Sequence, residues 1–215
     1  MMSYVPGEYW LKHGRTYKDD FRYNKLFELQ ERVLIDYLKQ NTTSFTSVLE
    51  IGCGFGRITK LILTNFGGIS EYHAIDISPE QIQNAKQLMK DKKEVFNNGL
   101  NLDFAVGDIT SLQMQKKYDL VIAAEVLMHI LPEDIRDVIH KLVKSSNKHV
   151  LNMDWYEEQR PKKAAPHNFV HQYEMIYREF PEVKQVSRVP ISKKGSWLRS
   201  IDTKQSLFHA LVNTA

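Results

Sequence analysis

The spacing of hydrophobic positions along the chain changes repeatedly between a strand-like and a helix-like period, and this alternation predicts a series of strands and helices. Continuous or alternating apolar runs predict strands, whereas apolar residues at three- and four-residue steps predict helices. Strands are predicted at Ser47 to Ile51, Tyr72 to Ile77, Leu100 to Val106, Tyr118 to Ala124 and His149 to Met153. Helices are predicted at Tyr23 to Lys39, Arg57 to Phe66, Pro79 to Glu94 and Pro132 to Ser145. Because the two kinds of segment alternate, the pattern favours βαβ units and a parallel sheet.

The regions on either side of this alternating stretch have a different character. Residues 1–22 are rich in aromatic and charged side chains and lack a clean period. After Trp155, a proline-containing loop precedes a segment, His167 to Phe180, that we expect to be helical. Two further β-type runs follow, at Val183 to Ile191 and Leu207 to Val212.

Composition narrows the class of protein without defining it. The 215 residues suffice for a large hydrophobic core, and the formal charge of +3 is too small to imply a nucleic-acid partner by itself. The single cysteine, Cys53, excludes an internal disulfide and a multi-cysteine metal site, which suits a reducing compartment. No apolar run approaches the roughly 20 residues that span a bilayer, and residues 1–18 lack a secretory apolar core. We therefore expect a cytoplasmic protein without a membrane partner.

A glycine cluster follows the first predicted strand and opens the next helix, which is the context of a nucleotide-binding loop. Glycines let the chain turn sharply and let its backbone approach a ligand closely. The dinucleotide fingerprint G-x-G-x-x-G requires glycine three residues after Gly54, where this chain has Arg57. The loop instead reads Glu-x-Gly-x-Gly-x-Gly from Glu50 to Gly56, so an NAD-dependent oxidoreductase is disfavoured. A loop that only shapes a strand-helix turn is the simpler alternative.

Two acidic residues at strand ends argue against that simpler alternative. Asp76 closes the second predicted strand, where a carboxylate can bind both hydroxyls of a ribose. Asp108 follows the third strand, where it can accept a hydrogen bond from an adenine amine while Ile109 lies beside the ring.

Together these residues resemble the class I methyltransferases that depend on S-adenosylmethionine (SAM), and the resemblance covers about residues 45–155. It implies that backbone around Gly52 and Gly54 packs against the methionine part of SAM, with Glu50 near the amino group. Asp76 would then hold the ribose and Asp108 the adenine, and the strand that ends at Glu125 would face the transferable methyl. The full set of expected cofactor-binding residues is Glu50, Gly52, Cys53, Gly54, Gly56, Asp76, Ile77, Asp108, Ile109 and Glu125.

The resemblance also implies a fold, a division of the chain and an activity. The expected fold is α/β, with a doubly wound, mostly parallel seven-stranded sheet, helices on both faces and an antiparallel C-terminal hairpin. We expect one domain, with an extension or lid at 1–44, a SAM-binding core at 45–155 and an acceptor-side insertion with the last strands at 156–215. The expected activity moves a methyl group to an O or N atom of a small-molecule or protein acceptor and leaves S-adenosylhomocysteine. An RNA-modifying enzyme and a non-catalytic SAM-binding partner subunit remain alternatives.

Two groups of polar residues are candidates for catalysis or acceptor binding. His129, just past the fourth strand, can serve as a general base if its imidazole is neutral, or it can merely cap the next turn. Asp154 ends the fifth strand, and His167, His171 and Tyr173 follow it. These four are candidate acceptor contacts, since the carboxyl edge of a parallel sheet opens toward the ligand crevice. A surface helix with a histidine stripe is the alternative for the last three.

The same segments raise the question of a metal ion. The stretch from Glu125 to His129 is similar to the Glu-x-x-Glu-His metal segment of small-RNA 3′-end methyltransferases and some ubiquinone-pathway O-methyltransferases. In this chain the second glutamate is replaced by Met128, a poor ligand for a hard cation. His167 and His171 have metal-ligand spacing on a helix, but no further ligands are evident. We therefore predict no metal site.

Two peripheral features have more than one interpretation. The N-terminal aromatic residues can form a lid over cofactor and acceptor, or pack the first helix onto the sheet; they are Tyr4, Tyr9, Trp10, Tyr17, Phe21 and Tyr23. The aromatic and basic segment from Lys193 to Arg199 can contact RNA, an acidic protein or nothing, because no recognised RNA-binding module accompanies it.

Overall fold

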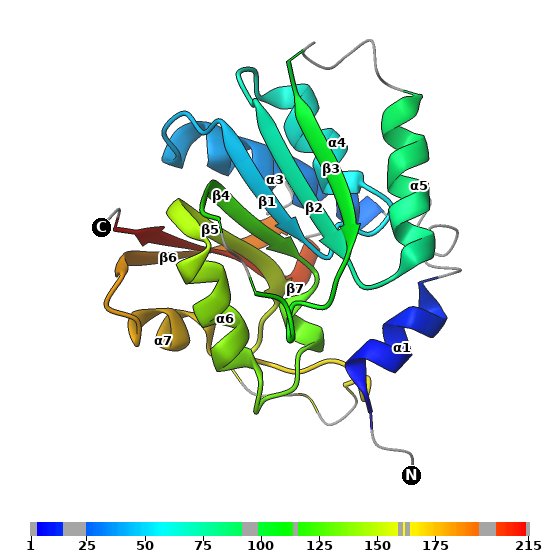
Figure 1. Ribbon diagram of the computed structural model, residues 1–215. Coiled ribbons are helices and arrows are strands. Elements are labelled where there is room, and N and C mark those ends of the chain that lie inside the picture. The colour runs from blue at the N-terminus through cyan, green and yellow to red at the C-terminus, as the bar shows by residue number, and fades with distance from the viewer. Residues whose placement is uncertain are drawn as a thin grey trace.

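A computed structural model describes residues 4–14, 25–91, 99–113, 116–158, 161, 164–193 and 201–213. Its centre is a seven-stranded sheet in the order β3-β2-β1-β4-β5-β7-β6. The strands are β1 (Ser47–Ile51), β2 (Glu71–Asp76), β3 (Asn101–Val106), β4 (Tyr118–Ala124), β5 (Ser146–Trp155), β6 (Val183–Lys193) and β7 (Ile201–Val212). The first five are parallel, whereas β7 is antiparallel to both β5 and β6 (Figure 1). The expected doubly wound sheet with its antiparallel C-terminal hairpin is confirmed.

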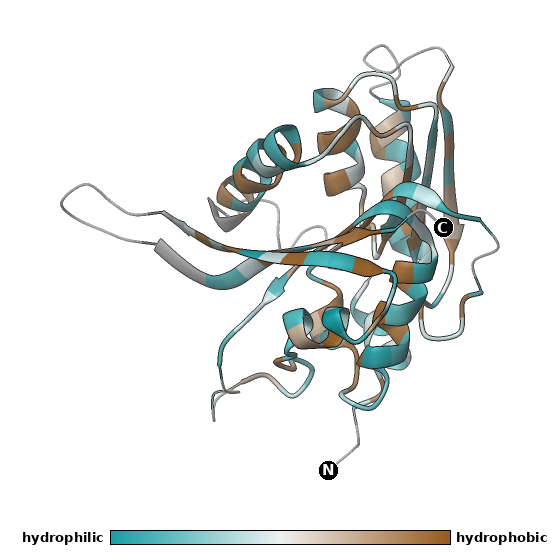
Figure 2. Cartoon of the chain, turned by 90° about the vertical axis from the view of Figure 1, so that its left-hand side faces the viewer, coloured by the Kyte–Doolittle hydropathy of each residue, from teal (hydrophilic) through white to brown (hydrophobic). Residues whose placement is uncertain are grey.

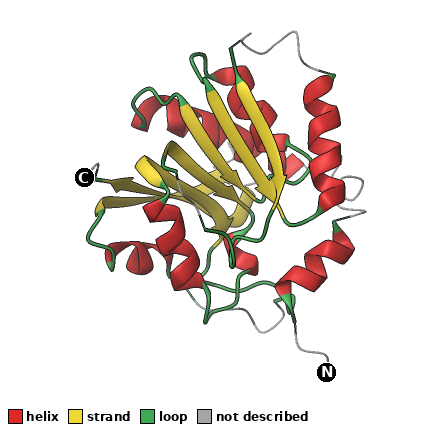
Figure 3. Ribbon diagram, in the orientation of Figure 1, coloured by secondary structure: helices red, strands yellow, loops and turns green. Residues whose placement is uncertain are grey.

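Helices cover both faces of this sheet (Figures 1 and 3). They are α1 (Pro6–His13), α3 (Lys25–Asn41), α4 (Arg57–Asn65), α5 (Pro79–Lys90), α6 (Ile135–Lys144), α7 (Tyr173–Arg178) and a short 3₁₀ helix, η2 (Leu127–His129). Helices α3, α4 and α5 contribute to one hydrophobic core, and α6 and α7 contribute to a second. Apolar residues follow the strands and the helix sides turned toward them, while polar residues lie on the outer sides (Figure 2). No helix among the described residues combines the length and apolar content that crossing a bilayer requires.

The central position of strand β4 in the sheet explains why its sequence is apolar without alternation. Successive side chains point to opposite faces of a sheet, so Leu120 and Ile122 enter the first core while Val121 and Ala123 enter the second. All four are almost fully buried, because β4 lies between β1 and β5 in the middle of the sheet. A continuous apolar run is therefore what this position requires.

Sequence signals at helix ends predicted the start of α5 correctly but placed the start of α6 too early. Helix α5 begins as expected, with Pro79 in its first turn and Ser78 as N-cap, whose Oγ accepts a hydrogen bond from the Gln81 amide at 3.3 Å. Helix α6 begins at Ile135 rather than Pro132, because a turn precedes it.

The largest departure from the expected elements lies before α7. We expected a helix from His167 to Phe180, but only Tyr173–Arg178 is helical. The preceding residues form a turn and then bond to the segment around η2, with the Phe169 amide donating to the Met128 carbonyl at 2.8 Å. His167 and His171 therefore do not share a helix face, and the histidine stripe that their spacing predicted is not formed.

Candidate functional site

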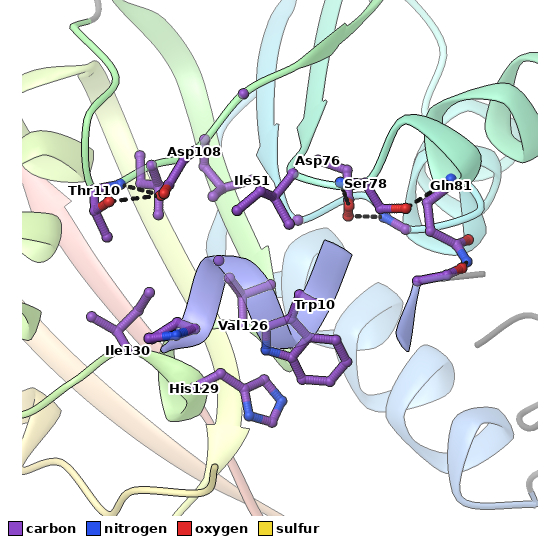
Figure 4. A pocket seen from close by; sticks show the side chains of 18 of the residues that line it. Trp10, Ile51, Asp76, Ser78, Gln81, Asp108, Thr110, Val126, His129 and Ile130 are labelled. Carbon is purple, nitrogen blue, oxygen red and sulfur yellow. Dashed lines mark hydrogen bonds between the residues drawn. The ribbon is translucent and has the colours of Figure 1, made fainter. Parts of the chain in front are cut away.

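A cavity of about 400 Å³ lies at the carboxyl ends of the parallel strands. The loops after β1, β2, β3 and β4 form its floor, and α1 and the residues beside it form its cover (Figure 4). In the sheet order, β1 is flanked by β2 on one side and β4 on the other, so the cavity opens where the chain reverses its winding direction. This switch point is where doubly wound α/β domains bind ligands.

The glycine loop gives the floor its shape. Gly52 has a φ of 67°, and a Cβ there would lie 2.3 Å from Val126 Cγ2, so a larger residue would be strained at this position. The amides of Gly52 and Cys53 both donate to the Ile75 carbonyl, at 2.7 and 3.0 Å, which ties the loop to β2. Gly52 and Gly54, two of the residues expected to bind the cofactor, line the cavity.

Asp76 connects two of the loops that form the floor. Its Oδ2 accepts a hydrogen bond from the Gly54 amide and its Oδ1 from the Ser78 amide, both at 2.8 Å. Burial raises the pKa of this carboxyl, although both amide hydrogen bonds act in the opposite direction. Asp76, expected to hold the ribose, and Ile77, also expected to bind the cofactor, line the cavity.

Asp108 lies at the same cavity, beyond the end of β3. Its Oδ1 accepts hydrogen bonds from the amide and the hydroxyl of Thr110, each at 2.8 Å, which fixes the carboxylate. Its Oδ2 is 3.9 Å from the point where a Cβ on Gly7 of α1 would lie. Ile77 and Ile109 also line the cavity, so apolar surface accompanies the acidic group.

Three residues expected to bind cofactor lie outside the cavity lining: Glu50, Cys53 and Gly56. Glu50 is buried, and its Oε2 accepts hydrogen bonds from the hydroxyls of Thr59 at 2.5 Å and Tyr72 at 2.7 Å. Burial raises the pKa of this carboxyl to about 7. Burial also raises the pKa of the Cys53 thiol, and Gly56 forms the N-cap of α4 with a φ of 88°. These residues support the loop from behind, and sequence spacing could not distinguish that position from the cavity.

Glu125 lines the cavity at the end of β4, in a backbone conformation unusual for glutamate. Its φ is 59°. Its Oε1 accepts hydrogen bonds from Gln205 Nε2 at 2.7 Å and Gln30 Nε2 at 3.2 Å, and its Oε2 lies 3.4 Å from Arg57 Nη2. The sequence analysis missed Gln30 and Gln205 because they come from distant segments and belong to no motif.

His129 also lines the cavity and packs against α1. Its ring lies 4.5 Å from the Trp10 ring (Figure 4). Its Nδ1 is 2.9 Å from the His167 carbonyl oxygen. A carbonyl oxygen can only accept, so Nδ1 carries the hydrogen and Nε2 carries the lone pair. Burial lowers the pKa of this imidazole to about 4, and a neutral ring at physiological pH follows.

The other candidate catalytic residues do not line the cavity, and three of them, Asp154, His167 and His171, instead contact the segment around η2. Asp154 is fully buried and accepts from the Met128 amide at 3.1 Å and from Asn152 Nδ2 at 2.8 Å. Burial raises the pKa of Asp154 to about 7 and lowers that of His171, whose Nε2 lies 3.1 Å from the Ile130 carbonyl, to about 4. Tyr173 is buried against Phe208, and His167 stacks on Tyr9. The prediction that these four residues contact an acceptor is therefore not supported by the shape of this cavity.

Helix α1 lies against the floor through two glycines that are two helical turns apart. Gly7 faces Ile77 and Asp108, while a Cβ on Gly14 would lie 2.3 Å from Ser78 Oγ. The Gln81 side-chain amide donates to the Gly14 carbonyl. Trp10, Gly7 and Gly14 all line the cavity. Trp10 is one of the aromatic residues for which a lid was one interpretation, whereas the two glycines were not predicted. Tyr17, Phe21 and Tyr23, and the segment 194–199, lie outside the described residues.

The site is suited to an adenosine-containing ligand. It combines a loop that excludes a Cβ at Gly52, a carboxylate at each of two strand ends, and apolar side chains between them. The described residues contain no group of three or more His, Cys, Asp or Glu side chains that could hold a metal ion. Fold and cavity together define a nucleotide-binding α/β domain of the doubly wound class.

Comparison with known proteins shows which family the central part of the chain resembles. Residues 49–148 match the family model described as a methyltransferase domain. The chain is 32% identical over 132 residues to a malonyl-acyl-carrier-protein O-methyltransferase of Acetivibrio thermocellus, which covers 61% of this chain and 43% of that protein. It is 28% identical over 120 residues to nodulation protein S of Sinorhizobium fredii, covering 54% and 50%. These findings support a class I, Rossmann-like SAM-dependent methyltransferase, with the family match confined to residues 49–148.

Solved structures support the fold over nearly the whole chain. N-methyltransferase NodS from Bradyrhizobium japonicum, in complex with S-adenosylhomocysteine, superposes with a TM-score of 0.73 at 19% identity, covering 98% of this chain and 100% of that one. SAM-bound magnesium protoporphyrin IX methyltransferase from Synechocystis gives 0.66 at 16% identity, covering 99% and 100%. By contrast, the chain spans less than half the length of the malonyl-acyl-carrier-protein methyltransferases that it matches.

Proposed function

We propose that the chain binds SAM in the 400 Å³ cavity and transfers its methyl group to an O or N atom of a small molecule. The observation that carries the proposal is the meeting of Gly52, Asp76 and Asp108 at one cavity over the switch point of the sheet. Asp76 would hold the ribose hydroxyls, Asp108 and Ile109 the adenine, and backbone around Gly52 the methionine part. When bound, SAM supplies a methyl group on a sulfonium; the carbon–sulfur bond breaks as the bond to the acceptor forms, and S-adenosylhomocysteine remains.

The chain's own residues would contribute mainly position and exclusion of water. In-line displacement depends strongly on the alignment of the reacting atoms. Helix α1 covers the cavity, and Trp10 packs on His129, so an apolar cover would exclude water during transfer. For a hydroxyl acceptor, the neutral His129 ring can accept a hydrogen bond at Nε2, while Glu125 offers a carboxylate at the same cavity.

Relatives favour methylation of a small organic group, free or carried on a protein, but do not identify the reacting atom. The matched proteins include O-methyltransferases named for malonyl-acyl-carrier-protein and for ubiquinone biosynthesis, and a structural neighbour is named as an N-methyltransferase. A protein acceptor remains compatible with the same donor site, and an RNA acceptor remains the alternative.

Calorimetric titration with SAM and with S-adenosylhomocysteine tests the donor site. Charge-assisted hydrogen bonds contribute about 1.5–3 kcal/mol each, so Asp76→Ala should weaken binding by about 30-fold or more. Asp137→Ala, which removes an exposed carboxylate from α6, is the matched control and should bind normally. Normal affinity in folded Asp76→Ala protein would contradict the ribose assignment.

A turnover assay separates an enzyme from a non-catalytic SAM-binding subunit. SAM would be incubated with the protein and a cell extract divided by ultrafiltration into small-molecule, protein and RNA fractions. S-adenosylhomocysteine should form with the small-molecule fraction and not with an Asp108→Ala control. Formation only with the protein fraction would redirect the proposal to a protein acceptor, and formation only with RNA to nucleic acid. SAM binding without turnover in any fraction would support the non-catalytic alternative.

A further inference from the structure

Helix α1 covers the 400 Å³ cavity and is attached to the rest of the chain in two different ways. Near its middle, the Trp10 ring packs 4.5 Å from the His129 ring. At its C-terminal end, Gly14 meets α5 so closely that a Cβ on it would lie 2.3 Å from Ser78 Oγ. The helix itself has no buried residue, whereas Gly14, its C-cap, is buried. The contact at Gly14 is therefore a buried attachment of an otherwise unburied helix.

Gln81 gives α1 a hydrogen bond that the helix cannot make for itself. The last four carbonyl groups of a helix have no partner within the helix. Gln81 Nε2 donates to one of them, the Gly14 carbonyl, from a side chain that is 2% exposed. This buried hydrogen bond fixes the end of α1 relative to α5.

A series of three hydrogen bonds joins this helix end to the expected ribose site. Asp76 Oδ1 accepts from the Ser78 amide at 2.8 Å, and Ser78 Oγ accepts from the Gln81 amide at 3.3 Å. The Gln81 side chain then donates to the Gly14 carbonyl. All four residues line the cavity, and Asp76, Ser78 and Gln81 lie along one edge of it (Figure 4). A ligand group at Asp76 therefore lies beside the contact that holds the cover.

The same side chain shows that holding the cover has a cost. Gln81 Oε1 is buried and has no hydrogen-bond partner among the described residues. Buried polar atoms are normally paired, because an unpaired one loses its hydrogen bonds to water without replacement. Packing α1 over Gln81 thus satisfies one end of the amide and leaves the other unpaired. Since α1 also contributes no residue to either hydrophobic core, a ligand that contacts both floor and cover will stabilise the closed position.

We propose that Gln81 is a positioning residue that holds α1 over the ribose, so that the cover closes on a nucleoside and not on a free base. The inference rests on the proposed function in one respect, namely that Asp76 binds the ribose hydroxyls. Adenine alone would lie at Asp108, away from the edge formed by Asp76, Ser78 and Gln81. A ribose on Asp76 would occupy the space that α1 covers at that edge, and so link the floor to the cover. Gln81 would then act on transfer through α1, by excluding water, and not through contact with the reacting atoms.

Hydrogen exchange of the full chain tests this proposal, with the amides of α1 as the readout. The probes are S-adenosylhomocysteine, adenosine and adenine, each near saturation. The first two should slow exchange in α1, and adenine should not. Gln81→Glu keeps the size of the side chain but turns an oxygen, in place of a donor, toward the Gly14 carbonyl. At neutral pH it should remove most of the slowing in α1, keep the slowing in the floor loop 52–56, and weaken S-adenosylhomocysteine binding about tenfold, equivalent to one hydrogen bond.

A lower pH separates positioning from a merely structural role. An ordinary glutamate has a pKa of about 4.3, and burial raises it. As pH falls from about 7 to about 5, protonation of the introduced carboxyl therefore restores a donor toward Gly14, and the affinity of Gln81→Glu relative to wild type should rise. Gln81→Met, which removes both polar atoms and cannot titrate, should loosen α1 equally at both pH values.

Gln83→Glu is the matched control, because Gln83 is exposed on the same helix and lies outside the cavity lining, so this variant should behave as wild type. Exchange in α1 and affinity that are the same in Gln81→Glu and Gln83→Glu would overturn the proposal. So would equal slowing of α1 by adenine and adenosine, or a weakened affinity of Gln81→Glu that does not recover at lower pH. Wild type that does not bind S-adenosylhomocysteine would count against the donor site, whereas binding without slower exchange in α1 would count against this inference alone.

Discussion

The floor and the cover of the cavity are encoded in different ways. The floor consists of short loops that directly follow β1, β2, β3 and β4, and each of its functional residues lies within a few positions of a strand end. The cover and the contacts of Glu125 bring together α1, α3 and β7, segments separated by most of the chain. The residues of the floor can therefore be predicted from local motifs, whereas those of the cover come together only through tertiary packing. A change in the cover should alter binding with little effect on folding, and a change beneath the floor should do the reverse.

The largest effect is expected beneath the floor, at Asp154. Both of its carboxylate oxygens accept hydrogen bonds, from the Met128 amide and from Asn152 Nδ2. Asp154→Asn would place an amide donor opposite one of these donors in a fully buried site. The free energy of unfolding in urea should fall by about 2–3 kcal/mol.

Asp137→Asn, on the exposed side of α6, should leave the unfolding free energy unchanged within about 0.5 kcal/mol. Equal stability of the Asp154→Asn protein and wild type would mean that this network does not hold η2 in place.

The cover can be tested by adding one methyl group at Gly14. Its backbone is right-handed helical, so alanine is tolerated by the backbone, but a Cβ would lie 2.3 Å from Ser78 Oγ. Helix α1 must then shift, and S-adenosylhomocysteine affinity should fall about tenfold, or about 1.4 kcal/mol. The unfolding midpoint should change little, because α1 contributes no buried residue to either core.

Gly67→Ala serves as the control, because a Cβ at Gly67 meets nothing within 4 Å. Calorimetry that gives Gly14→Ala the same affinity as Gly67→Ala would show that α1 is not part of the ligand site.

Two buried titratable groups, one behind the floor and one away from the cavity, should respond to pH in opposite directions. Burial raises the pKa of Glu50, behind the floor, from 4.5 to about 7, so its protonated form is favoured in the folded state. Its stabilising contribution is complete below pH 4.5 and is lost as pH rises to about 7. Burial lowers the pKa of His209, on β7, from 6.5 to about 4, so its contribution is present above pH 6.5 and is lost as pH falls toward 4. Each slope is at most about 1.4 kcal/mol per pH unit.

Urea unfolding of wild type, Glu50→Gln and His209→Gln separates the two contributions. The measurements run from about pH 5 to about pH 8, a range in which both groups change their charge in the folded or the unfolded state. Relative to wild type, Glu50→Gln should gain stability as pH rises from 5 to 7. His209→Gln, which removes a ring bonded to His149 at 3.0 Å and Tyr37 at 3.1 Å, should gain relative stability as pH falls. Parallel pH profiles for all three proteins would refute the assignment of these groups.

The difference between local and tertiary contacts also explains which elements and residues could be predicted from the sequence. Strand β4 was predicted residue for residue because burial on both faces requires an unbroken apolar run from Tyr118 to Ala124. Gly52 and Asp76 were predicted because steric and hydrogen-bonding demands on a strand-end loop are local. His167 was misplaced on a helix because its segment bonds to η2, a contact that no local pattern records. Gln205 was missed for the same reason.

The smallest effect is expected at Ser78, the point where floor and cover meet. Ser78→Gly removes the N-cap hydroxyl of α5, and glycine is nearly as good a cap, so the cost should be only a few tenths of a kcal/mol. It also removes both side-chain atoms, Oγ at 2.3 Å and Cβ at 2.6 Å, that a Cβ on Gly14 would meet. The double variant with Gly14→Ala should therefore recover at least half of the binding free energy that Gly14→Ala loses. The Trp10 carbonyl, 2.9 Å from the added Cβ, keeps the recovery incomplete. Strict additivity of the two changes in a calorimetric double-mutant cycle would mean that α1 does not rest on the floor through this contact.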